Sequence, residues 1–211
     1  MIAVLDYGIG NLRSAEKAIQ RVGGEARLVA DPDAAAGASG VVLPGVGAFG
    51  ACARALRASR LDAVAVRAIE SGVPFLGVCV GFQLLFEASE EDPGAEGLGL
   101  LDGTVRRLTG DVKLPQMQWN RAERVDGVAS AMLAPFAEPP WFYFVHSYAP
   151  VPTGRAADSV VATCDYGGTV VAAVERGNCW ATQFHPEKSG RSGLRLLEAF
   201  VGACTGEVRL S

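Results

Sequence analysis

The sequence predicts an α/β protein with an open, mostly parallel central sheet flanked by helices and an antiparallel extension in its second half. Over residues 1–90, short apolar segments alternate with segments whose apolar residues recur at helical spacing. This alternation is typical of a parallel sheet covered on both faces. The second half contains strand-like segments joined by short turns, which favours antiparallel pairing. No repeat or linker interrupts the chain, so we expect a single domain over residues 1–211.

The first half is expected to alternate strands and helices. Its predicted strands are Ile2–Asp6, Ala26–Ala30, Gly40–Leu43 and Val73–Val78, and its helical segments are Leu12–Val22, 51–71 and Phe82–Ala88. Asn11 is placed to cap the first helix, and Gly23 and Gly24 are placed to end it.

The second half is expected to be mainly antiparallel. Its predicted strands are Thr104–Leu108, Trp141–Tyr148, Val160–Asp165, Val170–Glu175 and Cys179–Phe184, and a helix is expected over Gly193–Cys204. Gly167 and Gly168 are typical of a hairpin turn, and residues 176–178 predict another.

The composition excludes several classes of protein. Of the 211 residues 49% are hydrophobic and the net charge is −4, so the chain can bury a core without a metal or a disulfide and is not disordered. No apolar stretch approaches the roughly 20 residues that span a bilayer, the amino end lacks signal-peptide features, and no basic run indicates a nucleic-acid partner. Five cysteines without a C-x-x-C pair favour a cytoplasmic protein, and the two histidines lack metal-ligand spacing, so no metal site is expected.

Cys79 is the strongest candidate for a catalytic residue. An apolar strand leads into it, a helix is expected directly after it, and Gly77 and Gly81 flank it. This is the G-x-S-x-G nucleophile elbow with sulfur in place of oxygen. The turn strains its central residue, the glycines avoid collisions, and the helix N-terminus favours the thiolate. The other cysteines, expected to be structural, are Cys52, Cys164, Cys179 and Cys204.

His185 is the better candidate of the two histidines for the base that a cysteine nucleophile needs. Pro186 favours an extended conformation at His185, which would place His185 and Glu187 on one face. The carboxylate could then orient the imidazole. The alternative is a surface turn with an incidental ion pair. His146 follows an aromatic strand and is expected to be structural or to line the substrate site.

A glycine-rich segment follows the third predicted strand. Residues Gly45–Gly50 fit G-x-G-x-x-G, which could indicate a dinucleotide site. However, Pro44 precedes the first glycine, and the next strand ends at Cys79 rather than at an acidic residue. We therefore favour close backbone approach to a ligand, in which the N–H groups of Gly47 and of Val80 stabilise an oxyanion. A plain loop is the alternative.

These motifs, in this order, resemble those of the class I (triad) glutamine amidotransferases, which implies a flavodoxin-like sheet. The segments that carry the resemblance are the elbow Gly77–Gln83, the loop Pro44–Gly47 and the end His185–Glu187. More narrowly, the chain resembles the glutaminase subunits of imidazole glycerol phosphate synthases. The segments that point to these subunits are Asp6–Leu12, Pro44–Phe49, Met117–Asn120, Tyr143–Tyr148 and Gln183–Ser189.

The chain departs from the usual pattern of these subunits at three positions. Val80 stands where leucine is usual, and Phe82 stands where methionine is usual; such exchanges between apolar side chains are tolerated when volume is nearly kept. Gln118 stands where glycine is usual, in a segment that faces the partner subunit in the family.

The resemblance implies hydrolysis of L-glutamine to glutamate and ammonia, with Cys79 as nucleophile, His185 as proton shuttle and Glu187 as its orienting group, and with no cofactor. Residues implied to hold the amino-acid end of glutamine are Gln83, Ser147 and Tyr148, and those implied to face the partner are Asn11, Trp119, Asn120, Tyr143 and Lys188. The implied partner is a (β/α)₈-barrel cyclase subunit, bound as a heterodimer. It uses the ammonia and a phosphoribulosyl-formimino nucleotide to form imidazole glycerol phosphate and an aminoimidazole carboxamide ribonucleotide in histidine biosynthesis.

Other functions stay open. The glutaminase of another synthase, such as anthranilate or pyridoxal phosphate synthase, would share the triad but not the segments at 119–120 and 143–148. A degenerate amidotransferase would serve only as a binding subunit, although the intact triad argues against it. A stand-alone cysteine hydrolase would be active without a partner. The aromatic residues near Trp119 and at 141–144 could also be ordinary core.

Overall fold

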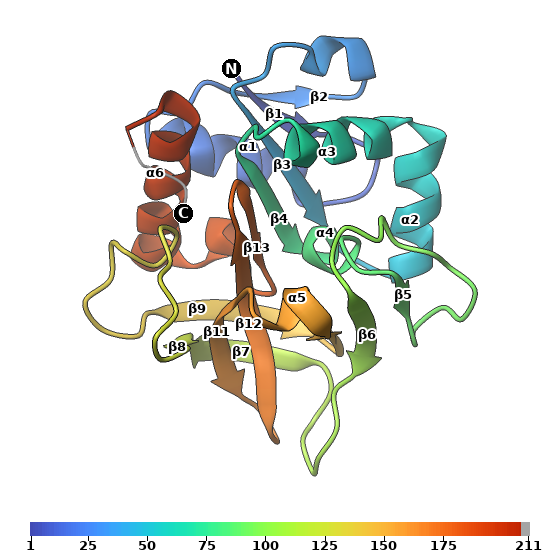
Figure 1. Cartoon of the computed structure of the whole chain (residues 1–211), viewed down its shortest axis with the longest axis vertical. Coiled ribbons are helices and arrows are strands. Elements are labelled where there is room, and N and C mark those ends of the chain that lie inside the picture. Colours follow the sequence, from blue (N-terminus) through green and yellow to red (C-terminus); the bar gives the residue numbers. More distant parts are fainter. Residues whose placement is uncertain (208–211) are drawn as a thin grey trace.

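An eight-stranded sheet runs through the centre of the molecule (Figure 1). In the computed structural model, which describes residues 1–207, its strands are β1 (Ile2–Leu5), β2 (Ala26–Val29), β3 (Gly40–Gly45), β4 (Phe75–Cys79), β8 (Glu123–Arg124), β11 (Val160–Asp165), β12 (Thr169–Arg176) and β13 (Cys179–Thr182). They lie in the order β2-β1-β3-β4-β13-β12-β11-β8. Neighbours from β2 to β13 are parallel, and neighbours from β13 to β8 are antiparallel. The predicted fold class is confirmed, and pairing changes direction at β13.

The helices are α1 (Leu12–Arg21), α2 (Phe49–Ala58), α3 (Leu61–Glu70), α4 (Val80–Gln83), α5 (Gly154–Ala157) and α6 (Gly190–Thr205), with 3₁₀ segments η1 (Pro32–Ala35) and η2 (Pro186–Lys188). α1, α3 and α4 pack against the parallel strands, whereas α5 packs against residues 148–152. α1 packs against α6, and α2 packs against α3. In Figure 1, α6 lies to the left of the sheet and α2 to its right.

Two of the predicted helical segments need correction. The segment 51–71 lies in two helices, α2 and α3, because the chain turns at Arg60, whose φ is +59°. The helix predicted over Phe82–Ala88 is confined to α4. The carbonyls of residues 84–86 accept hydrogen bonds from the N–H groups of residues 98–101, so they are not available to continue a helix.

Two small sheets lie beside the main one. A three-stranded sheet contains β5 (Ala88–Ser89), β6 (Gly103–Arg107) and β10 (Tyr148–Pro152), and a two-stranded sheet contains β7 (Gln116–Arg121) and β9 (Trp141–His146). The strand predicted over Trp141–Tyr148 is therefore two strands, which separate at Ser147. The sequence does not predict β7, because after Gln116 its residues are exposed or half-buried and show no apolar alternation.

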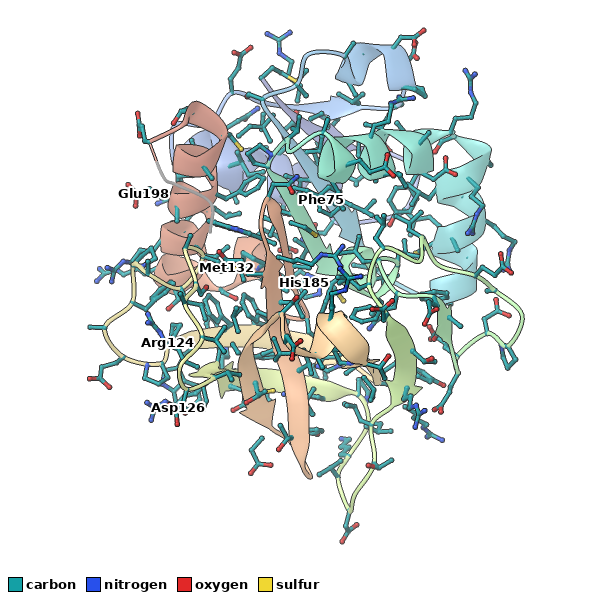
Figure 2. The ribbon with its side chains drawn as sticks, viewed as in Figure 1. Phe75, Arg124, Asp126, Met132, His185 and Glu198 are labelled. Carbon is teal, nitrogen blue, oxygen red and sulfur yellow. The ribbon has the colours of Figure 1, made fainter. Side chains whose placement is uncertain are left out.

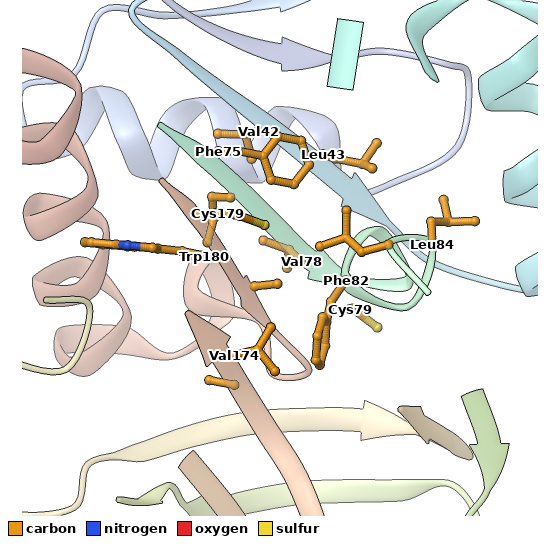
Figure 3. Close-up of a cluster of buried hydrophobic side chains, with 14 of the residues drawn as sticks. Val42, Leu43, Phe75, Val78, Cys79, Phe82, Leu84, Val174, Cys179 and Trp180 are labelled. Atoms are coloured by element: carbon orange, nitrogen blue, oxygen red, sulfur yellow. The ribbon is translucent and has the colours of Figure 1, made fainter. Parts of the chain in front are cut away.

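The core beneath Cys79 is built from β3, β4 and β13 (Figure 3). Side chains alternate along each strand, so Phe75 of β4 and Leu43 of β3 lie on one face of the sheet, whereas Val78 of β4 and Trp180 of β13 lie on the other. All of these side chains are buried. Because β4 has a hydrogen-bonded neighbour on both sides, its end is a rigid base for the residue that follows it.

The prediction of one domain over residues 1–211 stays a prediction, and residues 208–211 lie outside the described part of the chain. Within residues 1–207, no helix is long and apolar enough to cross a membrane.

Candidate active site

Cys79 lies on a strained turn between β4 and α4. Its backbone has φ 55° and ψ −111°, in a region that is costly for a residue other than glycine. The glycines make the turn possible. A Cβ on Gly81 would overlap the carbonyl of Leu43, and a Cβ on Gly77 would lie 3.1 Å from the Gly81 oxygen. The chain therefore makes the sharp strand-to-helix turn that the sequence predicts.

His185 lies in the interior of the molecule, beyond the end of β13 (Figure 2), and forms a buried pair with Glu187. Nδ1 of His185 lies 2.8 Å from Oε1 of Glu187, and the side chains are 1% and 5% exposed. They project together as the sequence predicts, but the expected extended geometry is wrong beyond His185. Pro186 begins the 3₁₀ turn η2, since proline suits the first position of a helical turn. This turn brings the carboxylate back to the imidazole.

The electrostatics of His185 favour its charged form. Burial lowers the pKa of the imidazolium, but the Cys79 thiol and the Glu187 carboxylate outweigh burial and raise this pKa to about 9. Nε2 is buried and has no hydrogen-bond partner in the described part of the chain. Because Cys79 is one of the groups that raise the pKa of this imidazolium, its sulfur lies near the ring, and Glu187 holds the ring at Nδ1.

Asn11 adds a hydrogen bond to this pair. It occupies the N-cap position of α1, as predicted, but its side chain does not cap the helix. Instead, its Nδ2 donates to Oε1 of Glu187 at 3.3 Å. The carboxylate that holds His185 is thus itself held by a residue from the opposite end of the chain.

A cavity of about 770 Å³ opens over the thiol. The predicted site residues that line it are Asn11, Gly47, Cys79, Val80, Gln83, Ser147, Tyr148, His185 and Lys188. Glu187 lies behind His185, and Trp119, Asn120 and Tyr143 are not part of the lining. The fold therefore gathers the thiol, the imidazole and the glycine-rich loop around one space.

The glycine-rich loop is fixed from below. The Tyr7 hydroxyl donates to the Pro44 carbonyl at 2.7 Å, and the Cys52 thiol donates to the Val46 carbonyl at 3.3 Å. Gly47 has φ +88°, a conformation that glycine adopts at little cost. The loop borders the cavity beside the thiol, which is where an oxyanion donor is needed.

Comparison with known proteins agrees with this geometry. The family model described as "Glutamine amidotransferase class-I" matches residues 3–203. The imidazole glycerol phosphate synthase subunit HisH of Methanothermobacter thermautotrophicus is 45% identical over 201 residues, covering 95% of this chain and 98% of that protein. The HisH subunit of Rhodopirellula baltica is 47% identical over 206 residues, covering 96% and 98%. This chain belongs to the HisH family of class I glutamine amidotransferases.

Solved structures with lower identity share the fold. A crystal structure of a glutamine amidotransferase superposes with a TM-score of 0.74 at 21% identity, covering 97% of this chain and 98% of that one. PurLQS from Thermotoga maritima gives a TM-score of 0.74 at 20% identity, covering 95% and 97%. Membership of the HisH family makes the dinucleotide interpretation of Gly45–Gly50 unnecessary.

Two residues of this HisH-family site are not predicted from the sequence. Glu91 lines the cavity and accepts a hydrogen bond from the N–H of Phe49 at 2.8 Å. Gln183 is fully buried, and its Nε2 donates to the sulfur of Cys79 at 3.7 Å. Gln183 could have been found from its spacing, because it stands two residues before His185. No local signal marks Glu91, which reaches the cavity through the irregular segment after β5.

His146 lines the cavity without joining the triad. Its Nδ1 lies 2.9 Å from the carbonyl oxygen of Tyr148, and burial lowers the pKa of its imidazolium to about 4. Both roles that the sequence allows for it, structural and substrate wall, are compatible with a buried neutral imidazole on the cavity lining.

The residues expected to face a partner lie mainly on the two-stranded sheet. Trp119 is 48% exposed and contacts Tyr143 edge-to-face at 6.1 Å, and Trp141 is 53% exposed. The alternative that these aromatics are ordinary core is wrong for both tryptophans but correct for Phe142 and Phe144, which are buried. Exposed aromatic side chains of this size are typical of a surface that another molecule covers.

The remaining cysteines are poorly placed for chemistry. Burial raises the pKa of the Cys164 thiol to about 11, and the pKa of Cys179 and of Cys204 to about 12. Burial also raises the pKa of Cys52. Within residues 1–207, no group of three or more His, Cys, Asp and Glu side chains could hold a metal ion.

Proposed function

We propose that this chain is the glutaminase subunit of an imidazole glycerol phosphate synthase and that Cys79, His185 and Glu187 are its catalytic triad. The observation that carries the proposal is the strained Cys79 elbow facing the buried His185–Glu187 pair across one cavity, in a chain of the HisH family. The reaction is hydrolysis of L-glutamine to glutamate and ammonia.

The first half of the reaction forms a thioester. The Cys79 thiolate attacks the side-chain amide carbon of glutamine, and the carbonyl electrons move onto oxygen. The N–H groups of Gly47 and Val80 stabilise that oxyanion. When the carbon–nitrogen bond breaks, the His185 imidazolium gives its proton to the leaving nitrogen, so ammonia departs and the imidazole is neutral.

The second half releases glutamate. Neutral His185 takes a proton from water, the resulting hydroxide attacks the thioester, and the sulfur leaves as thiolate beside the reformed imidazolium. Glu187 fixes the ring with Nδ1 protonated, so that Nε2 faces the reacting atoms. The same contact stabilises the charged ring in both halves.

The amino-acid end of glutamine carries one positive and one negative group. Glu91 places a carboxylate on the cavity wall, where it can bind the α-ammonium group. The segment at Ser147 and Tyr148 lines the same cavity, and its backbone N–H groups suit the α-carboxylate. Gln83 supports this segment, because its Nε2 donates to the Tyr148 carbonyl at 2.9 Å.

The ammonia is delivered to a (β/α)₈-barrel cyclase subunit in a cytoplasmic heterodimer, and the pathway is histidine biosynthesis. The residues proposed to lie on the side of the partner are Asn11, Trp119, Asn120, Tyr143 and Lys188. Asn11 and Lys188 line the cavity, whereas Trp119 is on the exposed sheet, so the set extends from the thiol to the surface. Such a path would keep ammonia away from water.

One experiment tests this function against its alternatives. The chain is purified with a candidate cyclase barrel, and glutamate release is measured alone, with the barrel, and with the barrel and its nucleotide substrate. We expect low activity alone and high activity in the full system, with imidazole glycerol phosphate formed. Full activity of the isolated chain would indicate a stand-alone hydrolase. No activity in any of the three measurements would indicate a subunit that only binds. Activation only by the partner of another synthase would indicate a different pathway.

A further inference from the structure

Two buried glutamine side chains connect the cavity wall to the nucleophile. Nε2 of Gln83 donates to the Tyr148 carbonyl at 2.9 Å and to Oε1 of Gln183 at 3.1 Å. Nε2 of Gln183 then donates to the sulfur of Cys79 at 3.7 Å. Gln83 is 3% exposed and Gln183 is fully buried, so water does not replace these contacts.

The hydrogen-bond chemistry fixes which way both amides point. The Tyr148 carbonyl can only accept, so the Gln83 atom facing it must be the NH₂ group. That NH₂ group also faces Gln183, so the Gln183 atom there must be its oxygen. The NH₂ group of Gln183 is left to face the sulfur. A backbone carbonyl thus determines, through two side chains, that a donor is aimed at Cys79.

We propose that Gln183 stabilises the thiolate of Cys79 by donating a hydrogen bond to its sulfur, and that Gln83 holds the Gln183 amide in the orientation this requires. The proposal rests on Cys79 being the nucleophile. An N–H donor interacts more strongly with a thiolate than with a thiol, because the contact becomes charge-assisted. The interaction therefore favours ionisation of the sulfur.

The placement of Gln183 supports a role beyond packing. Its backbone N–H is already bonded to the Ala172 carbonyl at 2.8 Å, so the strand register does not depend on the side chain. The residue stands two positions before His185 on the segment that follows β13. One short segment therefore carries both the imidazole of His185 and the amide of Gln183 that lie near the sulfur of Cys79.

Other groups that titrate also face this sulfur, and a test must separate them from Gln183. They are His185 after β13, Tyr7 after β1 and Cys52 on α2, with Glu187, Glu91 and His146 next to these. All of these residues are kept when Gln183 is replaced. The difference in Cys79 reactivity between the variant and the unmodified sequence, measured over the same pH range, therefore reports the effect of the Gln183 amide.

The test is the pH dependence of Cys79 alkylation in the full chain. The protein reacts with iodoacetamide over roughly pH 5 to 10, and modification of the Cys79 peptide is followed by mass spectrometry. For Gln183→Leu we expect the midpoint of the rate curve to move up by about one pH unit, the scale of one hydrogen bond to a charged group. Gln83→Leu should give a smaller upward shift, and the double variant no more than Gln183→Leu alone.

The chain offers a matched control. Gln116 is also fully buried, and its Nε2 donates to the sulfur of another cysteine, Cys164, at 3.8 Å. Gln116→Leu removes the same kind of contact from a cysteine other than the one that is measured, so the Cys79 midpoint should equal that of the unmodified sequence. Equal shifts in Gln116→Leu and Gln183→Leu would overturn the proposal, because the effect would then be a general loss of packing.

A second variant tests the proposal if Gln183→Leu folds poorly. Gln183→Glu keeps the shape and replaces the donor by a carboxylate, so we expect an upward shift at least as large. An unchanged midpoint in a folded Gln183 variant contradicts the proposal. Because the alkylation requires neither glutamine nor a partner, a shifted midpoint in a chain that shows no glutaminase activity even with the cyclase barrel and its nucleotide would refute the proposed function and leave the role of Gln183 intact.

Discussion

The region around the His185–Glu187 pair buries charged side chains, whereas the two-stranded β7–β9 sheet exposes aromatic ones. His185 and Glu187 are 1% and 5% exposed, and they are paired with each other. On the sheet, Trp119 and Trp141 are 48% and 53% exposed. Burying charge is costly unless it is paired, and exposing large aromatics is costly unless another surface covers them. Under the proposed function, we therefore expect the triad to lie within this chain and a partner to cover the exposed sheet.

The two regions meet at Tyr143. Its ring contacts Trp119, its carbonyl accepts a hydrogen bond from the His185 N–H at 3.0 Å, and its N–H donates to the Ser189 hydroxyl at 2.9 Å. That hydroxyl donates to the His185 carbonyl at 2.6 Å. A molecule bound to the sheet would therefore contact residues that are one hydrogen bond from His185.

The largest expected effect comes from removing the nucleophile. Cys79→Ala should lower glutamate release by a thousandfold or more, because the triad acts as a unit, and should leave the melting temperature nearly unchanged. Cys204→Ala, on the far helix α6, is the control that keeps activity. A glutamine-like electrophile should label Cys79 alone. Label on another cysteine, with Cys79 unmodified, would show that the buried region is not the reactive one.

Partner binding should give the next largest effect. Gly47, whose φ is +88°, allows the loop to move between a state with an oxyanion donor and a state without one, whereas Gly45 is held in β3 opposite Cys79. Losing one donor costs about a hundredfold to a thousandfold. We therefore expect the cyclase with its nucleotide to raise glutaminase activity by a similar factor, measured as kcat for glutamate release. Equal rates for the isolated chain and for the complex with its nucleotide would show that glutaminase activity does not depend on a partner at the exposed sheet.

The pKa of His185 makes the stability of the buried pair depend on pH. Its pKa is raised from 6.5 to about 9 in the folded chain, so the pair stabilises the fold fully below about pH 6.5 and loses that effect as the pH rises through about 9. Glu187→Gln should cost on the order of 1–2 kcal/mol at pH 6, and less at pH 9 and above. Urea unfolding at both pH values checks this. A loss that grows with pH would contradict the pairing.

Trp119→Ala tests the exposed region. Because Trp119 contacts Tyr143 but is half exposed, its removal should cost only about 0.5–1.5 kcal/mol in unfolding free energy. In the complex, glutamate should form in excess over imidazole glycerol phosphate, since ammonia would escape. Trp141→Ala, on the same sheet, is the control that keeps a one-to-one ratio. A stable Trp119→Ala protein with a one-to-one ratio would rule out a gate at this residue.

Gln118→Gly should have the smallest effect. Gln118 lies in β7 opposite Phe144, and the non-glycine residues with positive φ in the described part of the chain are Arg60 and Cys79. Gln118 is therefore unstrained, and glycine should destabilise the strand by about 0.5–1 kcal/mol through the entropy of the unfolded chain. A more stable glycine variant would show that this strand prefers the residue usual in the family. Thermal melting measures the difference.

The sequence predicts the parallel strands and the triad because their signals are local. Strands β1 to β4 are short segments rich in apolar residues, and the elbow is predicted by the spacing of Gly77, Cys79 and Gly81. The pairing of His185 with Glu187 follows from closeness along the chain, although a 3₁₀ turn and not an extended segment produces it.

What the sequence does not predict depends on distant parts of the chain. β7 carries exposed side chains, and only its pairing with β9 makes it a strand. The helix expected over Phe82–Ala88 ends early because residues 98–101 compete for its carbonyls. Asn11 reaches Glu187 across 176 positions of sequence, and no periodicity records such a contact.

The close approach of Gly81 to the Leu43 carbonyl means that the residue at this position of the elbow cannot be replaced, whereas its neighbours can. Val80 and Phe82 already differ from the residues usual in these subunits, and both are buried side chains whose volume neighbours can absorb. Gly81 instead brings one backbone against another, where no repacking can make room. The position of the Cys79 sulfur in the cavity is therefore set by a contact between main-chain atoms. We expect the side chains around the elbow to differ among relatives, while the position of the thiol stays the same.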